Sequence, residues 1–246
     1  MAPACWAALL GVAALAWVLT VRRASGMPAG PGTMGLDLWA FLVLWTLMMG
    51  AMMLPSVAPT VALYARTVRS ASPGRVRAAR SVSLVAGYLT AWAGFGLVAF
   101  AAAWAGGVLA AHAPGASAWV GAVVLAAAGL YQFSPLKRRC LTHCRSPLGF
   151  LLRFGGYSGK LRDLRVGLYH GAYCIGCCWG LMVVLIAVGV MNPAWMGALA
   201  AVVLLEKTGR HGIGLSMAFG VALIVFAFLV PWYPSLVPGL QGSGGM

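Results

Sequence analysis

Long apolar stretches, separated by short polar ones, follow one another along almost the whole chain. An apolar run of about 18 or more residues can cross the hydrocarbon core of a bilayer as a helix. The pattern therefore predicts an all-α, polytopic transmembrane helix bundle of about seven spans, six to seven in all. The predicted spans lie at roughly residues 5–21, 37–64, 83–110, 117–134, 166–190, 193–207 and 214–231.

The first segment, residues 5–21, also resembles the apolar core of a signal peptide. It lacks a basic start and is followed by Arg22 and Arg23, so we interpret it as a retained span.

The composition is that of a membrane protein. Of the 246 residues, 62% are hydrophobic and 8% are charged, whereas soluble domains are about half apolar and a quarter charged. The apolar runs leave no soluble domain, so a single integral membrane domain is expected over residues 1–246, with its core at 37–232. The tail at 241–246 is expected to be flexible.

Positive charge is concentrated in the polar stretches between the apolar runs. The net charge is +14, and all Lys and Arg except Arg22 and Arg23 fall at residues 66–80, 137–165 and 207–210. Basic loops remain in the cytoplasm beside anionic lipid. We therefore expect a multi-pass protein of the cytoplasmic membrane, with these loops inside and with membrane lipid, not nucleic acid, as their partner.

The longest polar stretch, residues 135–165, is expected to form a basic cytoplasmic loop. Apolar residues beside its basic ones are typical of a short helix at the membrane surface. These are Leu148, Phe150, Leu151, Leu152 and Phe154.

Side chains that bind metals gather in YHGAYCIGCCWGLM, residues 169–182, within a predicted span. In a helix, four of them share one stripe at steps of four residues, with Cys177 beside them. The four are His170, Cys174, Cys178 and Met182. Thiolate, imidazole and thioether suit soft or borderline ions, so the stripe predicts Cu(I) first and zinc second.

Helix packing is the alternative interpretation of this segment. Cysteine also behaves as a small apolar residue, and small residues let membrane helices approach closely. Gly171, Ala172, Gly176 and Gly180 on the same helix support it. Three thiols with a collinear histidine favour the metal site.

A methionine cluster in WTLMMGAMMLPS, residues 45–56, is the second candidate. Met48 and Met52, and Met49 and Met53, stand one helical turn apart. Pro55 is expected to kink the helix. Such a cluster can bind or pass Cu(I), but taken alone it favours core packing, because methionine commonly fills gaps.

CLTHC, residues 140–144, is the third candidate. Cys140 and Cys144 are at helical spacing with His143 between them, on the side where thiols stay reduced. We interpret the three residues as a metal gate below the cysteine stripe. An inert surface pair is the equal alternative.

Depth connects these candidates. Counting about 1.5 Å per residue from the span ends puts both sulfur clusters near the bilayer midplane and Glu206 level with Cys178. A carboxylate at that depth needs a partner, and Lys207, His170 or a bound cation is expected. Alternatively, Glu206 and Lys207 merely end a short span at the inner membrane surface.

Four motifs in order carry a family resemblance: MMGAMMLPS, YQFSPLKRRCLTHCRSP, GLYHGAYCIGCCWGLM and MNPAWMGALAAVVLLEK. Together they resemble a family of bacterial predicted metal-binding integral membrane proteins, a domain of unknown function sometimes described as copper-related. The resemblance covers roughly residues 37–232 and implies a bacterial inner-membrane protein. The matching positions are Met48, Met49, Met52, Met53, Pro55, Cys140, Cys144, His170, Cys174, Cys177, Cys178, Met191, Met196, Glu206 and Lys207.

Three hypotheses follow. The leading one is a membrane protein that handles Cu(I) as a transporter, chaperone or delivery factor, with a copper protein or membrane complex as partner. The alternatives are a metal-dependent membrane oxidoreductase and a structural subunit of a larger membrane complex. No signature of an ATP-driven pump, zinc protease, esterase or c-type haem protein is present, so an enzyme is not favoured and no catalytic residue is assigned.

Overall fold

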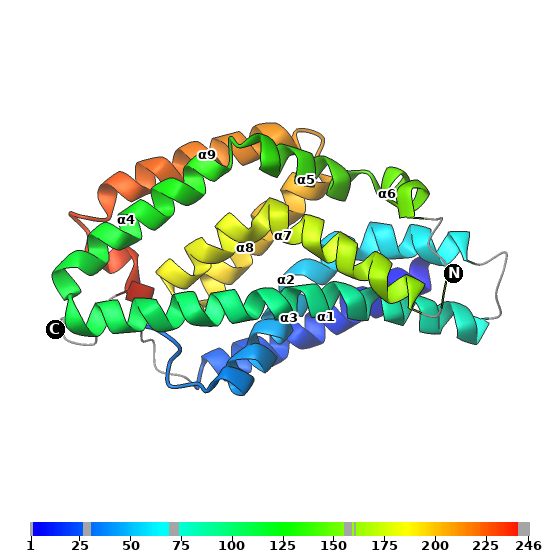
Figure 1. Ribbon diagram of the computed structural model, residues 1–246, viewed down its shortest axis with the longest axis horizontal. Coiled ribbons are helices and arrows are strands. Elements are labelled where there is room, and N and C mark those ends of the chain that lie inside the picture. Colours follow the sequence, from blue (N-terminus) through cyan, green and yellow to red (C-terminus); the bar gives the residue numbers. More distant parts are fainter. Residues whose placement is uncertain (1, 27–30, 69–73, 155–158, 160, 241–246) are drawn as a thin grey trace.

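The structure, a computed structural model, describes residues 2–26, 31–68, 74–154, 159 and 161–240. Within these ranges the chain is a bundle of helices without β-strand (Figure 1), as the apolar pattern predicts. The helices are α1 (Ala2–Ala24), α2 (Leu38–Thr67), α3 (Gly74–His112), α4 (Pro114–Tyr131), α5 (Pro135–Arg145), α6 (Pro147–Phe154), α7 (Arg162–Val188), α8 (Pro193–Thr208) and α9 (Gly212–Leu229), followed by the short 3₁₀ helices η1 (Pro234–Leu236) and η2 (Pro238–Leu240). The predicted flexible tail lies outside the described residues.

Six helices in the described part of the chain are long and apolar enough to cross a membrane: α1, α2, α3, α4, α7 and α9. The first predicted span is thus a helix, packed along α2. The predicted span at 193–207 is helix α8, with 16 residues. That length is about 24 Å, shorter than the roughly 20 residues of a bilayer crossing. The described residues therefore contain six candidate spans, the smaller of the two predicted numbers.

Two predicted loops were wrong in part, because they contain helices. Helix α3 begins at Gly74, so the second half of the basic stretch 66–80 is its first turns. The stretch 135–165 holds α5, α6 and the start of α7. Pro135 begins α5, where a missing N–H costs nothing, and the Ser134 hydroxyl accepts a hydrogen bond from the Lys137 amide at 3.1 Å.

Helix α6 agrees with the short helix predicted near residues 148–154. Its position at the membrane surface remains a prediction. One of its apolar residues turns inward: Phe150 is buried and packs on the ring of His170, with the ring centroids 4.8 Å apart. The apolar pattern therefore serves the protein core as well as the outer surface.

Helices α3 and α7 pack with their backbones almost in contact. A Cβ atom at Gly87 would overlap the Leu164 carbonyl, and one at Gly167 would overlap the Leu84 carbonyl. One turn further along α7, a Cβ at Gly171 would lie 2.5 Å from that of Ala91. Small residues permit this approach. The seam fixes the first half of α7, and with it the direction of the cysteine stripe.

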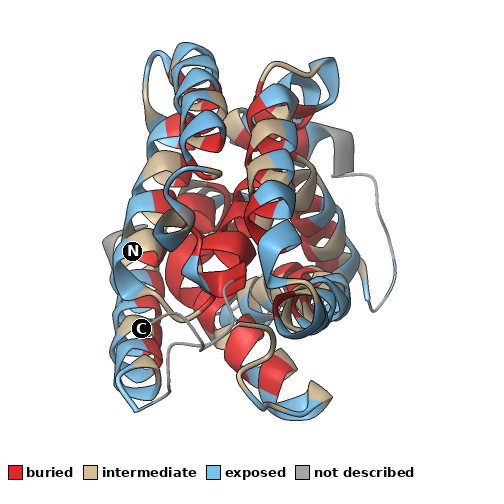
Figure 2. Cartoon of the chain, turned by 90° about the vertical axis from the view of Figure 1, so that its left-hand side faces the viewer, coloured by how far each residue is buried: buried red, intermediate tan, exposed pale blue. Residues whose placement is uncertain are grey.

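Helix α7 occupies the middle of the bundle. It runs between α3 on one side and α4 on the other, while α9 packs on α4 and α1 packs on α2 (Figure 1). Buried residues are concentrated in this interior, and exposed ones lie on the outer helices (Figure 2).

Large aromatic side chains are exposed at one end of the bundle. Trp39 begins α2, Trp119 lies near the start of α4, and Trp232 and Tyr233 follow α9. Aromatic residues collect in this way at membrane–water interfaces. The basic starts of α3 and α7 lie at the opposite end (Figure 1). The arrangement is compatible with a multi-pass membrane protein, and the cytoplasmic assignment of the basic end remains a prediction.

Candidate metal centre

Three cysteines of α7 form a compact cluster. The sulfurs of Cys174, Cys177 and Cys178 all lie within 4.8 Å of one another, and all three residues are buried. Spacings of three and four residues place them on one face of the helix. Metal–sulfur bonds of about 2.3 Å let two sulfurs that share an ion lie up to about 4.6 Å apart. One ion can therefore be reached by this set with little movement.

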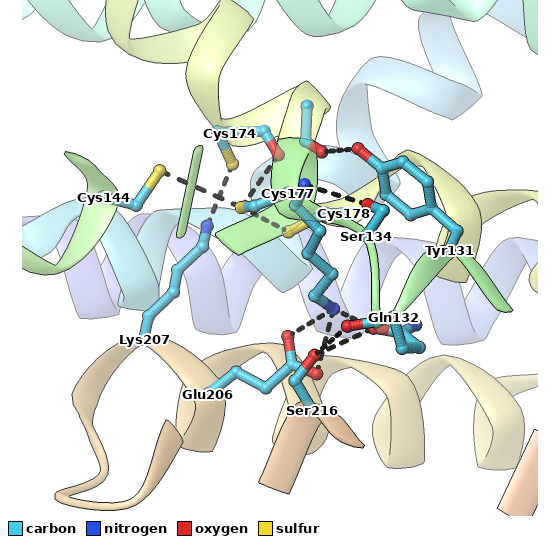
Figure 3. A network of polar contacts seen from close by, with 12 residues as sticks. Tyr131, Gln132, Ser134, Cys144, Cys174, Cys177, Cys178, Glu206, Lys207 and Ser216 are labelled. Atoms are coloured by element: carbon cyan, nitrogen blue, oxygen red, sulfur yellow. Dashed lines mark hydrogen bonds and ion pairs between the residues drawn. The ribbon is translucent and has the colours of Figure 1, made fainter. Parts of the chain in front are cut away.

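A fourth sulfur comes from α5. The Cys144 sulfur lies 3.9 Å from that of Cys177 (Figure 3). Close packing of α5 on α7 makes this approach possible, because a Cβ at Gly176 would lie 2.6 Å from the Cys140 sulfur. The Tyr131 hydroxyl also donates a hydrogen bond to the Gly176 carbonyl. CLTHC thus places a cysteine directly against the stripe.

The other two members of CLTHC lie beside the cluster. Cys140 is buried, and burial raises the pKa of its thiol, so it is neutral at neutral pH. His143 is half-buried. Its ring stacks on that of Tyr173, with the ring centroids 4.5 Å apart. Its Nδ1 lies 2.8 Å from the backbone oxygen of Arg139.

Two polar side chains contact the Cys174 sulfur from other helices. The Lys207 ammonium lies 2.9 Å from it and the Tyr88 hydroxyl 3.0 Å from it. A nearby cation stabilises a thiolate. Cys174 is therefore the cysteine of the cluster whose sulfur contacts a lysine and a tyrosine side chain.

Lys207 also connects the cysteine cluster with α2. Its ammonium donates to the Ser56 hydroxyl at 3.1 Å, and that hydroxyl donates to the Met53 carbonyl at 2.8 Å. Ser56 directly follows Pro55, so Lys207 contacts α2 next to the proline that follows the four methionines. Helix α2 continues through Pro55 and through Pro59.

The methionines of both segments are buried. Met48, Met49, Met52 and Met53 on α2 and Met182 on α7 have at most 1% of their surface exposed, so none faces lipid. Their role as copper ligands stays a prediction.

His170 is buried one turn before Cys174, between the rings of Tyr88 and Phe150. Its Nδ1 has no hydrogen-bond partner among the described residues. An imidazole nitrogen without a partner suits a ligand position at the end of the stripe.

The partner expected for Glu206 was wrong. Its carboxylate pairs with Lys137 of α5, at 2.9 and 3.1 Å, and both side chains are 1% exposed. Gln132 accepts a hydrogen bond from the same ammonium, and Ser216 donates to Gln132 at 3.1 Å (Figure 3). This pair satisfies the carboxylate without a metal, so we leave Glu206 out of the proposed ligand set.

The alternative for Glu206 and Lys207, the end of a short span at the membrane surface, stays a prediction. Both residues lie in the last turn of the short helix α8, and both are buried in protein. At the end of α8, the Arg145 guanidinium donates a hydrogen bond to the Glu206 carbonyl. This contact satisfies a backbone group that the end of a helix leaves open.

Sequence reasoning missed Tyr88 and Ser56 as neighbours of the cluster and of Lys207, and it missed Lys137 as the ion partner of Glu206. Lys207 was considered as an ion partner of Glu206, as a possible span end and as a family-matching position, but not as a neighbour of Cys174. A lysine within an apolar segment is a functional signal in itself and could have marked it. Tyr88 and Ser56 carry no comparable signal.

A bundle of apolar helices around a buried cysteine cluster is compatible with a multi-pass membrane protein, and the three thiols of the cluster could hold a metal ion. The chain matches the profile of the PpoB2 family, described as copper chaperone, over residues 42–230. It belongs to this family, which agrees with the copper-related resemblance of its motifs. No curated protein and no solved structure matches the chain.

Proposed function

We propose that the protein binds Cu(I) inside its helix bundle through the sulfurs of Cys174, Cys177 and Cys178, and delivers it to a copper protein. The observation that carries this proposal is the buried three-sulfur cluster, with its sulfurs within 4.8 Å. Soft ligands of this kind select Cu(I), and the copper chaperone family of the chain supports the same ion. Copper is here the cargo of the protein.

The charges around the cluster favour a monovalent ion with two thiolates. Such a complex carries one negative charge, and the Lys207 ammonium beside Cys174 balances it. Balance matters because a buried, unpaired charge is expensive. The third thiol can then stay protonated or replace one ligand during transfer. Zinc, which prefers four ligands, is the second candidate because Cys144 offers a fourth sulfur.

Cargo passes, in this proposal, through CLTHC on α5. The gap of 3.9 Å between the sulfurs of Cys144 and Cys177 is short enough for both to hold one ion during exchange. Cys140 and His143 complete the gate. At the other end of the stripe, His170, Met182 and the α2 methionines are secondary ligands along the route.

A cysteine-to-serine series tests the proposal. The variant with Cys174→Ser, Cys177→Ser and Cys178→Ser is purified in detergent, loaded anaerobically with Cu(I) and analysed for copper and zinc by mass spectrometry. We expect bound copper to fall to background. Cys5→Ser is the matched control, because Cys5 lies on α1 and outside the cluster.

Retained helicity, measured by circular dichroism, shows that the triple variant is folded. Copper content equal to wild type in a folded triple variant contradicts the proposal. Selective retention of zinc by the wild-type protein under the same loading contradicts the assignment of Cu(I).

A further inference from the structure

A cavity separate from the cysteine cluster lies between α1 and α3. Its volume is about 470 Å³, and α1, α2 and α3 all line it. Leu54 and Val61 of α2 are buried and form its floor, whereas Val12 of α1 and Val82 of α3 are exposed at its rims. The cavity is thus a groove open to the surroundings of the bundle.

The groove has the length of one lipid chain. On α2 its lining extends from Leu54 to Ala65, which is about 16 Å at 1.5 Å per residue. One leaflet contributes about half of a hydrocarbon core of about 30 Å. The α3 lining, from Gly74 to Leu89, runs alongside. An acyl chain parallel to the helices therefore fits its long axis.

The charged group of this groove lies at one end. Arg77 of α3 lines that end, Ser81 lies about midway along the α3 lining, and the rest of the wall is apolar apart from the Cys5 thiol. Arg77 is half-buried and lies in the basic first turns of α3, at the end of the bundle that carries the positive charge. Basic pockets between membrane helices bind anionic lipid headgroups on the cytoplasmic side.

We propose that this groove is a binding site for an anionic phospholipid, with one acyl chain along α1, α2 and α3 and the phosphate at Arg77. The positive end, the apolar wall and the length together match a single lipid of the leaflet at the basic end. The proposal is independent of copper binding.

Lipid titration by native mass spectrometry tests it. Delipidated protein is titrated with phosphatidylglycerol and with phosphatidylcholine that carries the same acyl chains. We expect wild-type protein to prefer phosphatidylglycerol, and Arg77→Ala to reduce its affinity for that lipid about fivefold, the contribution of one basic residue at an anionic surface. A bulky side chain in the groove, Ala78→Trp, should lower the binding of both lipids.

Arg75→Ala is the matched control. Arg75 is an exposed arginine two residues away that does not line the groove, so its loss should leave the lipid preference unchanged. Equal losses in Arg75→Ala and Arg77→Ala would show attraction to general surface charge and overturn the site. Equal affinity of wild-type protein for the two lipids would overturn the headgroup assignment. Copper content and helicity report on the fold of each variant.

Discussion

The ammonium of Lys207, at the end of α8, lies 2.9 Å from the sulfur of Cys174 in the middle of α7. Both residues are buried, so solvent does little to screen the interaction. The contact joins the only charged group on the cysteine cluster, among the described contacts, to a thiol proposed to hold Cu(I). Lys207 is therefore expected to set the affinity of the cluster for its cargo.

Lys207→Met keeps an unbranched side chain that is one atom shorter, and removes its charge. We expect the affinity for Cu(I) to fall at least about tenfold, equivalent to about 1.4 kcal/mol, because the copper–thiolate complex loses its balancing charge. Competition with a Cu(I) chelator measures the change. Arg210→Met, at an exposed arginine shortly after α8, serves as a charge-matched control. Wild-type affinity in Lys207→Met would remove Lys207 from the site.

Glu206→Gln is expected to destabilise the bundle without removing copper. The substitution leaves Lys137 as a buried charge without a counterion, and breaking a buried pair from one side costs about 3–5 kcal/mol. Thermal unfolding in detergent, followed by circular dichroism, should show a clear loss of stability. Replacing both partners, as Lys137→Met with Glu206→Leu, should recover much of it. A loss of bound copper in a folded Glu206→Gln protein would instead assign the carboxylate to the metal site.

Helix periodicity was enough to predict the core of this site from sequence. The three α7 cysteines cluster because spacings of three and four residues share one helical face. The packing interpretation was also right for two of the glycines that it named, because Gly171 packs closely against α3 and Gly176 against α5; Gly167 adds a further contact with α3. Metal binding and helix packing therefore involve different residues of the same helix. The residue pattern in the sequence does not show which residues serve which role.

The surroundings of the cluster were only partly predictable, because CLTHC was expected below the stripe but Lys137 was not expected at Glu206. Lys137 and Cys144 stand in a polar stretch that the charge pattern assigns to a loop, yet α5 folds against α7 and α8 and buries both. Local patterns encode the helix but not the direction in which it turns after Ser134. For this reason Lys207, His170 or a bound cation was expected as the partner of Glu206, and Lys137 was not.

Gly167→Ala tests the seam between α3 and α7. Its added Cβ would overlap the Leu84 carbonyl, and overpacking of a close contact costs about 1–3 kcal/mol. We expect a lower unfolding temperature and a smaller yield of monodisperse protein in size-exclusion chromatography. Gly94→Ala is the matched control on α3, because its Cβ meets nothing within 4 Å. Equal stability of the two variants would contradict the tight seam.

Cys144→Ser separates the gate from the storage site. Because Cys144 lies 3.9 Å from Cys177 but on a different helix, we expect its loss to slow the transfer of Cu(I) into the cluster while the final copper content stays at the wild-type value. Stopped-flow measurement of transfer from a Cu(I)–chelator complex should show loading at least about tenfold slower. This corresponds to a rise of about 1.4 kcal/mol in the activation free energy of transfer. Cys5→Ser should load at the wild-type rate. If Cys144→Ser instead loads normally but holds less copper, Cys144 is a permanent ligand, and the site is a four-sulfur centre of the kind that also suits zinc.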